Sequence, residues 1–268
     1  MKFLLAAFSL GFASMAFVAS AETYSLWHDD PDMAAVLQDW AAFVEEGSEG
    51  AIVVTFEQVS EADLLAAVKT GEADLALIKP GQTPDTFNPF EAFQLPMTNL
   101  NQVNASQAAA DYAATAEATD AFEGTKILSA WLDTLTFQMS DDIMQGNVAA
   151  LLDAFLQPTT WQGSSYQLVM TAELYESLPL DQQSVLDENS GPALAEFMAN
   201  ALAELPREKA VIVNGQTLAS LPPEAQEFLQ QRVRPVFSDW IQRAEDAGYN
   251  GFEIIEQTSR LLQENSIQ

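Results

Sequence analysis

The sequence predicts an α/β fold, in which short buried strands alternate with amphipathic helices. Within residues 23–78, three short apolar runs alternate with two segments of helical periodicity. This order predicts right-handed crossovers and a parallel sheet. Of the 268 residues, 48% are hydrophobic, which is enough for one large core or two smaller ones. The apolar content excludes an intrinsically disordered chain, and the lack of cysteine excludes a disulfide scaffold and a cysteine-ligated metal site.

The first part of the chain contains five of these elements. They are, in order, a strand at 23–27, a helix from Met33 to Gly47, a strand at 51–56, a helix at 62–69 and a strand at 74–78. Apolar residues at helical spacing indicate the first helix, and Gly47 ends it. Ser60 with Asp63 forms a capping-box-like start for the second helix, and Gly71 supplies its stop.

The rest of the chain is predicted to be a long loop followed mainly by helices. The expected elements are a loop at 79–100, a helix at 104–121, strands at 125–131 and 134–139, a helix at 143–155, a strand at 166–170, a helix at 179–205, a short strand at 210–213, and helices at 222–247 and 251–262. We find no internal repeat and no low-complexity linker.

Residues 1–21 have the pattern of a secretory signal peptide. Lys2 precedes an apolar stretch of 17 residues, Phe3 to Ala19, which leads into Ala19-Ser20-Ala21, the small-x-small pattern that signal peptidase requires. An N-terminal membrane anchor is the alternative, since the stretch is close to spanning length. The small residues and the acidic sequence from Glu22 onward favour cleavage after Ala21, which predicts a periplasmic protein. No later segment has the ~18 consecutive apolar residues of a membrane span.

The charge balance limits the partners of this chain. There are 39 acidic and 10 basic residues, giving a net charge of −29. Such a chain repels phosphate backbones and anionic lipids, which disfavours nucleic-acid binding and peripheral membrane attachment. An anionic ligand would also need local cations to offset this repulsion.

Four stretches, in this order, carry a resemblance to a known family. They are Trp40 to Glu46 leading into the strand Gly50 to Phe56; Ser60 to Leu75, with a helix, the spacing x-x-G-x-x-D and a strand; Tyr166 to Thr171 followed by Tyr175 to Gln183; and Asp239 to Ile241 with Ala247 to Gly251. Together they resemble the periplasmic solute-binding proteins of tripartite ATP-independent (TRAP) transporters.

The resemblance implies a periplasmic-binding-protein-like fold with two lobes, a hinge and a ligand cleft between the lobes. The implied division is a signal peptide at 1–21, a first α/β lobe at 22–137, a shortened second lobe and hinge at 138–205, and a C-terminal strand and long helices at 206–268 that pack across the lobes. The implied function is an exported receptor that delivers a small solute to membrane permease subunits. General α/β geometry places the ligand at the same location, beyond the carboxyl ends of the strands.

The sequence departs from this family in the second lobe. Between Ser140 and Ala154, only Asp141 to Asp153 are present. Family members have a longer region there, with a Gly-x-Lys-x-Arg strand whose arginine binds the substrate carboxylate. The present chain has no arginine before Arg207, so that clamp is absent. A carboxylate is therefore only one candidate class of ligand.

Four residues are candidates for ligand contact. Trp27 ends the first strand, and either stacks on a ligand or packs under a loop. Lys79 follows the third strand, and either binds a carboxylate as a point charge or is a solvated loop lysine. Trp131 ends the strand that leads toward the second lobe, and Trp161 lies on the return path, where hinge packing is the alternative.

The sequence shows no catalytic, metal or cofactor site. His28 is the only histidine, and beside Asp29 and Asp30 it is expected to be a surface residue with a local hydrogen bond. The acidic cluster lacks the ligand spacing of a calcium loop, so capping of the helix near Pro31 and Asp32 explains it better. No nucleotide loop or nucleophile elbow is present, so we expect no enzyme activity.

Two further hypotheses stand beside the solute receptor. The shortened lobe and the missing arginine also fit a derived, non-transporting relative that acts as a protein-interaction or sensor-partner module. They fit, too, an internally deleted gene product that folds poorly. The receptor hypothesis requires a ligand site, whereas an interaction module exposes an apolar patch where the missing strands would pack.

Overall fold

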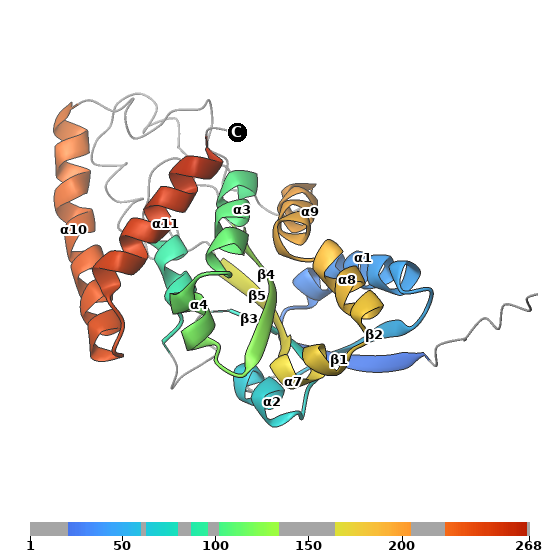
Figure 1. Ribbon diagram of the computed structural model, residues 1–268. Coiled ribbons are helices and arrows are strands. Elements are labelled where there is room, and N and C mark those ends of the chain that lie inside the picture. The colour runs from blue at the N-terminus through green and yellow to red at the C-terminus, as the bar shows by residue number, and fades with distance from the viewer. Residues whose placement is uncertain are drawn as a thin grey trace, which may run out of the picture.

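The computed structural model describes residues 21–59, 63–79, 87–95, 102–133, 164–204 and 223–266, and the statements below concern these residues. The elements are shown in Figure 1 and are β1 (Glu22–His28), α1 (Pro31–Gly47), β2 (Ile52–Gln58), α2 (Leu64–Thr70), β3 (Leu75–Ile78), η1 (Pro89–Gln94), α3 (Gln102–Tyr112), α4 (Ala116–Ala121), β4 (Thr125–Asp133), β5 (Ser164–Thr171), α7 (Ala172–Ser177), α8 (Leu180–Glu188), α9 (Gly191–Glu204), α10 (Pro223–Asp246) and α11 (Gly251–Asn265). The predicted elements at 134–139, 143–155 and 210–213, and the signal peptide up to residue 20, lie outside the described residues.

The five strands form one mixed sheet in the order β2-β1-β3-β5-β4. The predicted parallel arrangement is confirmed for β1, β2 and β3. β5 is antiparallel to both of its neighbours, β3 and β4. Since Ser164 at the start of β5 pairs with Asp133 at the end of β4, the chain re-enters the sheet at the end where β4 left it. β5 therefore lies between two strands that come before it in the sequence.

Helices cover both faces of the sheet (Figure 1). Side chains alternate along β3, so that Leu75 and Leu77 join a core with α1, α8 and α9, while Ala76 and Ile78 join a second core. This second core includes α2, η1, α3, α4, α10 and α11. Because all four residues of β3 are buried, the strand reads as a continuous apolar run in the sequence.

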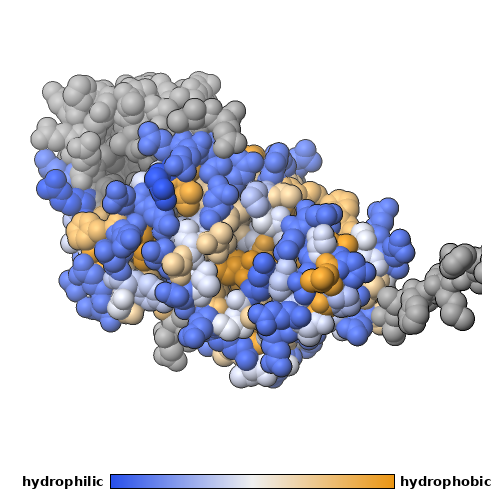
Figure 2. Space-filling model, in the orientation of Figure 1, coloured by the Kyte–Doolittle hydropathy of each residue, from blue (hydrophilic) through white to orange (hydrophobic). Residues whose placement is uncertain are grey.

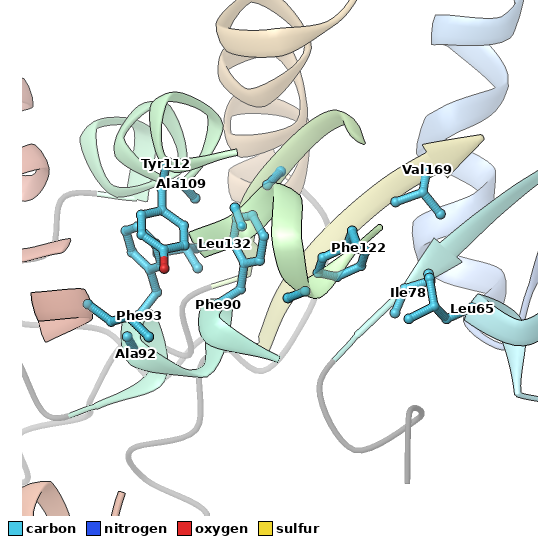
Figure 3. Close-up of a cluster of buried hydrophobic side chains, with 14 of the residues drawn as sticks. Leu65, Ile78, Phe90, Ala92, Phe93, Ala109, Tyr112, Phe122, Leu132 and Val169 are labelled. Atoms are coloured by element: carbon cyan, nitrogen blue, oxygen red, sulfur yellow. The ribbon is translucent and has the colours of Figure 1, made fainter. Parts of the chain in front are cut away.

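Aromatic rings fill the second core (Figure 3). The Phe90 ring lies edge-on to Tyr112, with ring centroids 5.2 Å apart, and edge-on to Phe122 at 5.9 Å. Phe90 and Phe93 are 0% and 3% exposed, as expected for side chains that cover the sheet. These contacts hold η1 against α3 and α4.

The x-x-G-x-x-D stretch joins α2 to β3. Gly71 ends α2 in the left-handed conformation with a φ of 73°, which favours glycine. Three residues later, one carboxylate oxygen of Asp74 accepts hydrogen bonds from the backbone N–H (2.7 Å) and the hydroxyl (3.0 Å) of Ser25. These bonds fasten the start of β3 to β1.

The predicted start of α2 at Ala62 with a Ser60 cap is wrong. α2 begins at Leu64, and Asp63 is its N-cap, accepting a hydrogen bond from the backbone N–H of Ala66 at 3.0 Å. An aspartate in the extended conformation is itself a strong cap, so Asp63 serves as the cap and lies just before the helix instead of within it. Ser60 lies outside the described residues.

Two predicted helices are each divided in the structure. The helix expected at 104–121 is α3 followed by α4, because Thr115 caps a new helix through the backbone N–H of Ala118. The helix expected at 179–205 is α8 followed by α9, with Asn189 and Ser190 between them. At the second break, Gly191 and Pro192 at the start of α9 were an available signal that the sequence analysis did not use.

The C-terminal helices α10 and α11 pack on the second core, at the end of the molecule away from β2 (Figure 1). Trp240, Ala244 and Ile254 are buried there. A Cβ atom at Gly251 would lie 2.9 Å from Cα of Ile241, so a glycine is required where the two helices meet. No helix among the described residues is long and apolar enough to cross a membrane.

Residues 164–204 are part of the same layered body as residues 22–133. β5 lies inside the sheet, and α8 and α9 pack on the core that contains α1. The sequence-based division placed these residues with the shortened second lobe and hinge. The connecting residues 134–163 are outside the described part, so the second lobe itself stays a prediction.

Candidate ligand-binding site

Polar side chains from several strands meet at one end of the sheet. β1, β3 and β4 end there and β5 begins there, with Ile78 paired to Gln167 and Trp131 paired to Tyr166. We call this region the carboxyl end of the sheet; its members are His28 to Asp30, Lys79, Trp131 to Asp133 and Ser164 to Gln167. In α/β sheets, ligands bind at this end.

Asp30 connects β5 to the start of α1. One carboxylate oxygen accepts a hydrogen bond from the backbone N–H of Met33 at 3.1 Å, which caps the helix. The other accepts a hydrogen bond from the hydroxyl of Tyr166 at 2.7 Å. Because β3 lies between β1 and β5, this bond spans the end of β3. The predicted capping role of the acidic cluster is therefore confirmed, with Asp30 as the cap and Pro31 as the first helical residue.

Lys79 lies at the carboxyl end of the sheet, as predicted, and is paired with an acid. Its ammonium is 3.3 Å from a carboxylate oxygen of Asp29, and the two side chains are 30% and 29% exposed. Part of the lysine charge is therefore already neutralised within the protein.

A buried amide pair, Asn88 and Gln167, lies on the face of the sheet that carries the second core, opposite the face of Tyr166. The amide nitrogen of Asn88 donates a hydrogen bond to the amide oxygen of Gln167 at 2.9 Å, and the amide oxygen of Asn88 accepts one from the backbone N–H of Phe90 at 3.0 Å. The hydroxyl of Ser165 donates to the backbone carbonyl of Phe90 at 3.3 Å. These polar residues were not predicted, although Ser165 and Gln167 inside an apolar strand were the available signal.

Three polar atoms at the carboxyl end of the sheet are buried and have no hydrogen-bond partner among the described residues. They are Nδ1 of His28, Nε1 of Trp131 and Nε2 of Gln167. The three side chains are 5%, 0% and 0% exposed, respectively. Buried polar groups are normally paired with protein or water. His28 and Trp131 face the core that contains α1, whereas Gln167 faces the second core, so the three atoms do not line one common space.

The prediction that His28 is a surface residue is wrong. It alternates in phase with the buried residues Tyr24 and Leu26, so its ring points into the core beside Phe56, with ring centroids 6.4 Å apart. Burial lowers the pKa of His28, and a hydrogen bond with the backbone of Asp30 and the charges of Asp29 and Asp30 oppose this shift only in part. The imidazole is therefore neutral at pH 7.

The four predicted contact residues have different surroundings. Trp27 is half-buried and packs against the second core. Trp131 is 0% exposed and stacks on Tyr166 with ring centroids 6.0 Å apart, so a ligand reaches it only if its neighbours move. Lys79 is partly exposed, and Trp161 lies outside the described residues. Lys126 is at the opposite end of the sheet, paired with Asp187 at 3.5 Å.

Among the described residues, no group of three or more histidine, cysteine, aspartate or glutamate side chains is placed to hold a metal ion. The site combines hydrogen-bonding atoms, partly exposed charges and aromatic rings, which is the composition of a small-molecule binding site.

Solved structures with the same fold include several TRAP solute-binding proteins. A marine-metagenome TRAP protein specific for aromatic acids, in complex with 3-hydroxybenzoate, is 19% identical over 91% of this chain and 99% of its own, with a TM-score of 0.68. A protein from Rhodoferax ferrireducens with copurified benzoate is 18% identical over 92% and 99%, with a TM-score of 0.67. One from Bordetella bronchiseptica with bound mandelate is 14% identical over 91% and 99%, with a TM-score of 0.59.

These similarities establish the fold. The periplasmic-binding-protein-like architecture implied by the four stretches of sequence is thereby confirmed. No protein-family model matches the chain, and no curated protein is significantly similar to it in sequence.

Proposed function

We propose that this protein is an exported receptor of the TRAP type, which binds a small solute at the carboxyl end of its sheet and delivers it to membrane permease subunits. One observation carries the proposal: the amide nitrogen of Gln167 is buried and has no hydrogen-bond partner among the described residues, at the end of the sheet where α/β proteins bind ligands. The fold shared with TRAP solute-binding proteins supports the same function. Residues 1–21 would direct export and are removed after Ala21.

The proposed contacts are Trp27, Lys79, Trp131 and Trp161, to which we add Gln167. Gln167 has a buried amide nitrogen to donate, while its oxygen is held by Asn88. Its orientation is thus fixed before a ligand arrives. Binding would favour a closed state by the difference between the ligand's affinities for the open and closed states.

A thermal-melt screen of the purified protein against organic acids, amines, amino acids and uncharged solutes tests the proposal. A ligand at 100 times its dissociation constant stabilises a fold by about 2.7 kcal/mol, which shifts the melting temperature measurably. We expect at least one class of solute to produce this shift. A cooperative melt that no solute moves would contradict the proposal and favour the protein-interaction module.

Two glutamine variants locate the binding site. Gln167→Leu removes the unpartnered amide nitrogen at the carboxyl end of the sheet. It is expected to weaken the affinity for the solute found in the screen by about tenfold, or about 1.4 kcal/mol. Gln182→Leu is the matched control, because Gln182 also has an unpartnered buried atom but lies in α8. Equal losses in both variants would place the ligand elsewhere.

A further inference from the structure

We infer that Asn88 determines the specificity of the site, because it holds the buried amide of Gln167 in the one orientation that requires a hydrogen-bond acceptor on the solute. This inference rests on the proposed function, since it concerns the chemistry of the same site. Three features of the structure lead to it: a chain of hydrogen bonds, the burial of both amides, and the apolar neighbours of Gln167 in the sheet.

The backbone fixes the orientation of the Asn88 amide. Asn88 is the N-cap of η1, and its side chain accepts a hydrogen bond from the backbone N–H of Phe90 at 3.0 Å. A backbone N–H can only donate, so the atom that receives this bond is the amide oxygen of Asn88. The other terminal atom is therefore the amide nitrogen, which lies 2.9 Å from the amide oxygen of Gln167.

The Asn88 amide in turn fixes the orientation of Gln167. An amide nitrogen also only donates, so Gln167 must turn its oxygen toward Asn88. The reversed orientation of Gln167 would place two N–H groups against each other. The free end of the Gln167 amide is therefore its nitrogen, which is buried and has no hydrogen-bond partner among the described residues.

Packing around η1 keeps this chain of hydrogen bonds in place. Asn88 and Gln167 are 2% and 0% exposed, so bulk water does not reorient either amide. The hydroxyl of Ser165 donates to the backbone carbonyl of Phe90 at 3.3 Å. The Phe90 ring lies edge-on to Tyr112 in the second core. The backbone N–H that orients Asn88 is thus itself held on two sides.

The neighbours of Gln167 in the sheet offer it no acceptor side chain. Gln167 is paired with Ile78 of β3 and with Ala130 of β4, and both of these side chains are apolar members of the second core. A solute with an acceptor atom would recover the cost of the unpaired donor, whereas a solute with a donor there would leave two donors facing each other. Sites built around a buried hydrogen bond discriminate strongly against analogues that cannot form it. The solute therefore presents an acceptor, such as a carbonyl oxygen or an unprotonated ring nitrogen.

Neutral ring compounds of matched shape separate acceptors from donors. Benzoxazole has acceptor atoms and no N–H group, indole has an N–H donor and no acceptor, and indene has neither. We would measure the affinity of the purified protein for these three probes at pH 8. We expect benzoxazole to bind at least about tenfold more tightly than indole or indene.

Two variants of Asn88 test its role as a positioning residue. Asn88→Asp keeps the acceptor for the N–H of Phe90 and replaces the donor by an oxygen, so Gln167 should rotate and indole should bind more tightly than benzoxazole. Asn88→Ser keeps a capping oxygen but is too short to reach Gln167, so the affinities for benzoxazole and indole should come within about twofold of each other. A residue that only caps η1 would leave the order of the probes unchanged in Asn88→Ser.

Gln94→Glu is the matched control for the added acid. The amide nitrogen of Gln94 lies 3.5 Å from the hydroxyl oxygen of Ser165, on the same face of the sheet as Gln167. The change introduces a carboxylate near the site without touching the pair of Asn88 and Gln167. Benzoxazole should remain the strongest of the three probes in this variant.

The outcomes distinguish the inference from the receptor function. If indole binds the wild type as tightly as benzoxazole, or if neither Asn88 variant changes the order, the inference is overturned while the receptor function stands. If Gln94→Glu reverses the order as Asn88→Asp does, the added charge is responsible and the inference fails. If Asn88→Asp does not fold, Asn88→Ser decides.

The thermal-melt screen separates the remaining cases. If the screen finds a solute but none of the three probes binds, the inference alone fails. If neither a solute nor a probe binds, the receptor function fails, and the inference fails with it.

Discussion

The two ends of the sheet differ in how completely their polar side chains are paired. At the amino end, where β3 and β4 begin, Asp74 accepts two hydrogen bonds from Ser25, and Lys126 is paired with Asp187. At the carboxyl end, Asp30 accepts a hydrogen bond from Tyr166, and Lys79 is paired with Asp29. His28, Trp131 and Gln167, however, each have a buried atom without a partner among the described residues. Among the described strand residues, buried atoms of this kind lie only at the carboxyl end.

This difference separates what holds the fold together from what is available for binding. A buried polar atom without a partner costs about 1–3 kcal/mol, and a molecule bound at the carboxyl end would recover part of that cost. The amino end has no such cost in its strands. We therefore expect substitutions at the amino end to change stability alone, and those at the carboxyl end to change stability and binding together.

The largest expected effect is that of Asp30→Ala. The change removes the cap of α1, worth ~1 kcal/mol, and the charged acceptor of the Tyr166 hydroxyl, a hydrogen bond worth ~1–3 kcal/mol. Urea denaturation should show a loss of about 2–4 kcal/mol in the free energy of unfolding. The exposed neighbour Asp32 is the control, and Asp32→Ala should cost less than about 0.5 kcal/mol. Equal losses would show that Asp30 does not join the two elements.

Asp74→Ala tests the amino end of the sheet. It removes the acceptor for the backbone N–H and hydroxyl of Ser25 and should lower the free energy of unfolding by about 1.5–3 kcal/mol. Affinity for any solute found in the screen should not change. The exposed Glu72 offers a matched control, since Glu72→Ala removes a nearby acid that has no role in joining β1 to β3. A loss of affinity in Asp74→Ala would break the distinction between the two ends.

His28 predicts a pH dependence of stability. Because burial lowers its pKa in the folded state, the unfolded chain binds the proton more tightly. Stability is therefore complete above the ordinary histidine value of about 6.5 and falls as pH decreases through the lower folded value. Denaturation at several pH values between 7.5 and 5 should show a smaller loss in His28→Phe than in the wild type. The chain has no other histidine, so an unchanged slope would contradict burial of a neutral ring.

The smallest expected effect is that of Lys126→Met. The Lys126–Asp187 pair is 40% and 52% exposed, and exposed pairs contribute about 0–1 kcal/mol. Thermal melts should change little, and solute affinity should be unaltered. A large loss of affinity would indicate a ligand at the amino end of the sheet.

The features that depend on neighbouring residues were predicted from the sequence. The first three strands, Gly71 as a helix stop and the acidic start of α1 all follow from local periodicity and capping preferences. The resemblance to TRAP solute-binding proteins, based on four ordered stretches, identified the fold correctly.

The features that depend on distant pairing were not predicted. The insertion of β5 between β3 and β4 is decided by contacts across the sheet, and no local pattern encodes it. The same holds for the site. Lys79 was placed correctly because it follows a strand directly, whereas the burial of Trp131 depends on Tyr166 from β5. His28 was assigned to the surface because its acidic neighbours outweighed its position in the strand alternation.

Backbone hydrogen exchange with and without a bound solute tests the central claim most directly, using the solute that gives the largest shift in the thermal melt. If the solute binds at the carboxyl end of the sheet, protection should increase at His28 to Met33, Trp131 to Asp133 and Ser164 to Gln167. Asp74, Lys126 and Asp187, at the amino end, should be unchanged. Protection centred on the amino end, or spread evenly over the sheet, would contradict the claim.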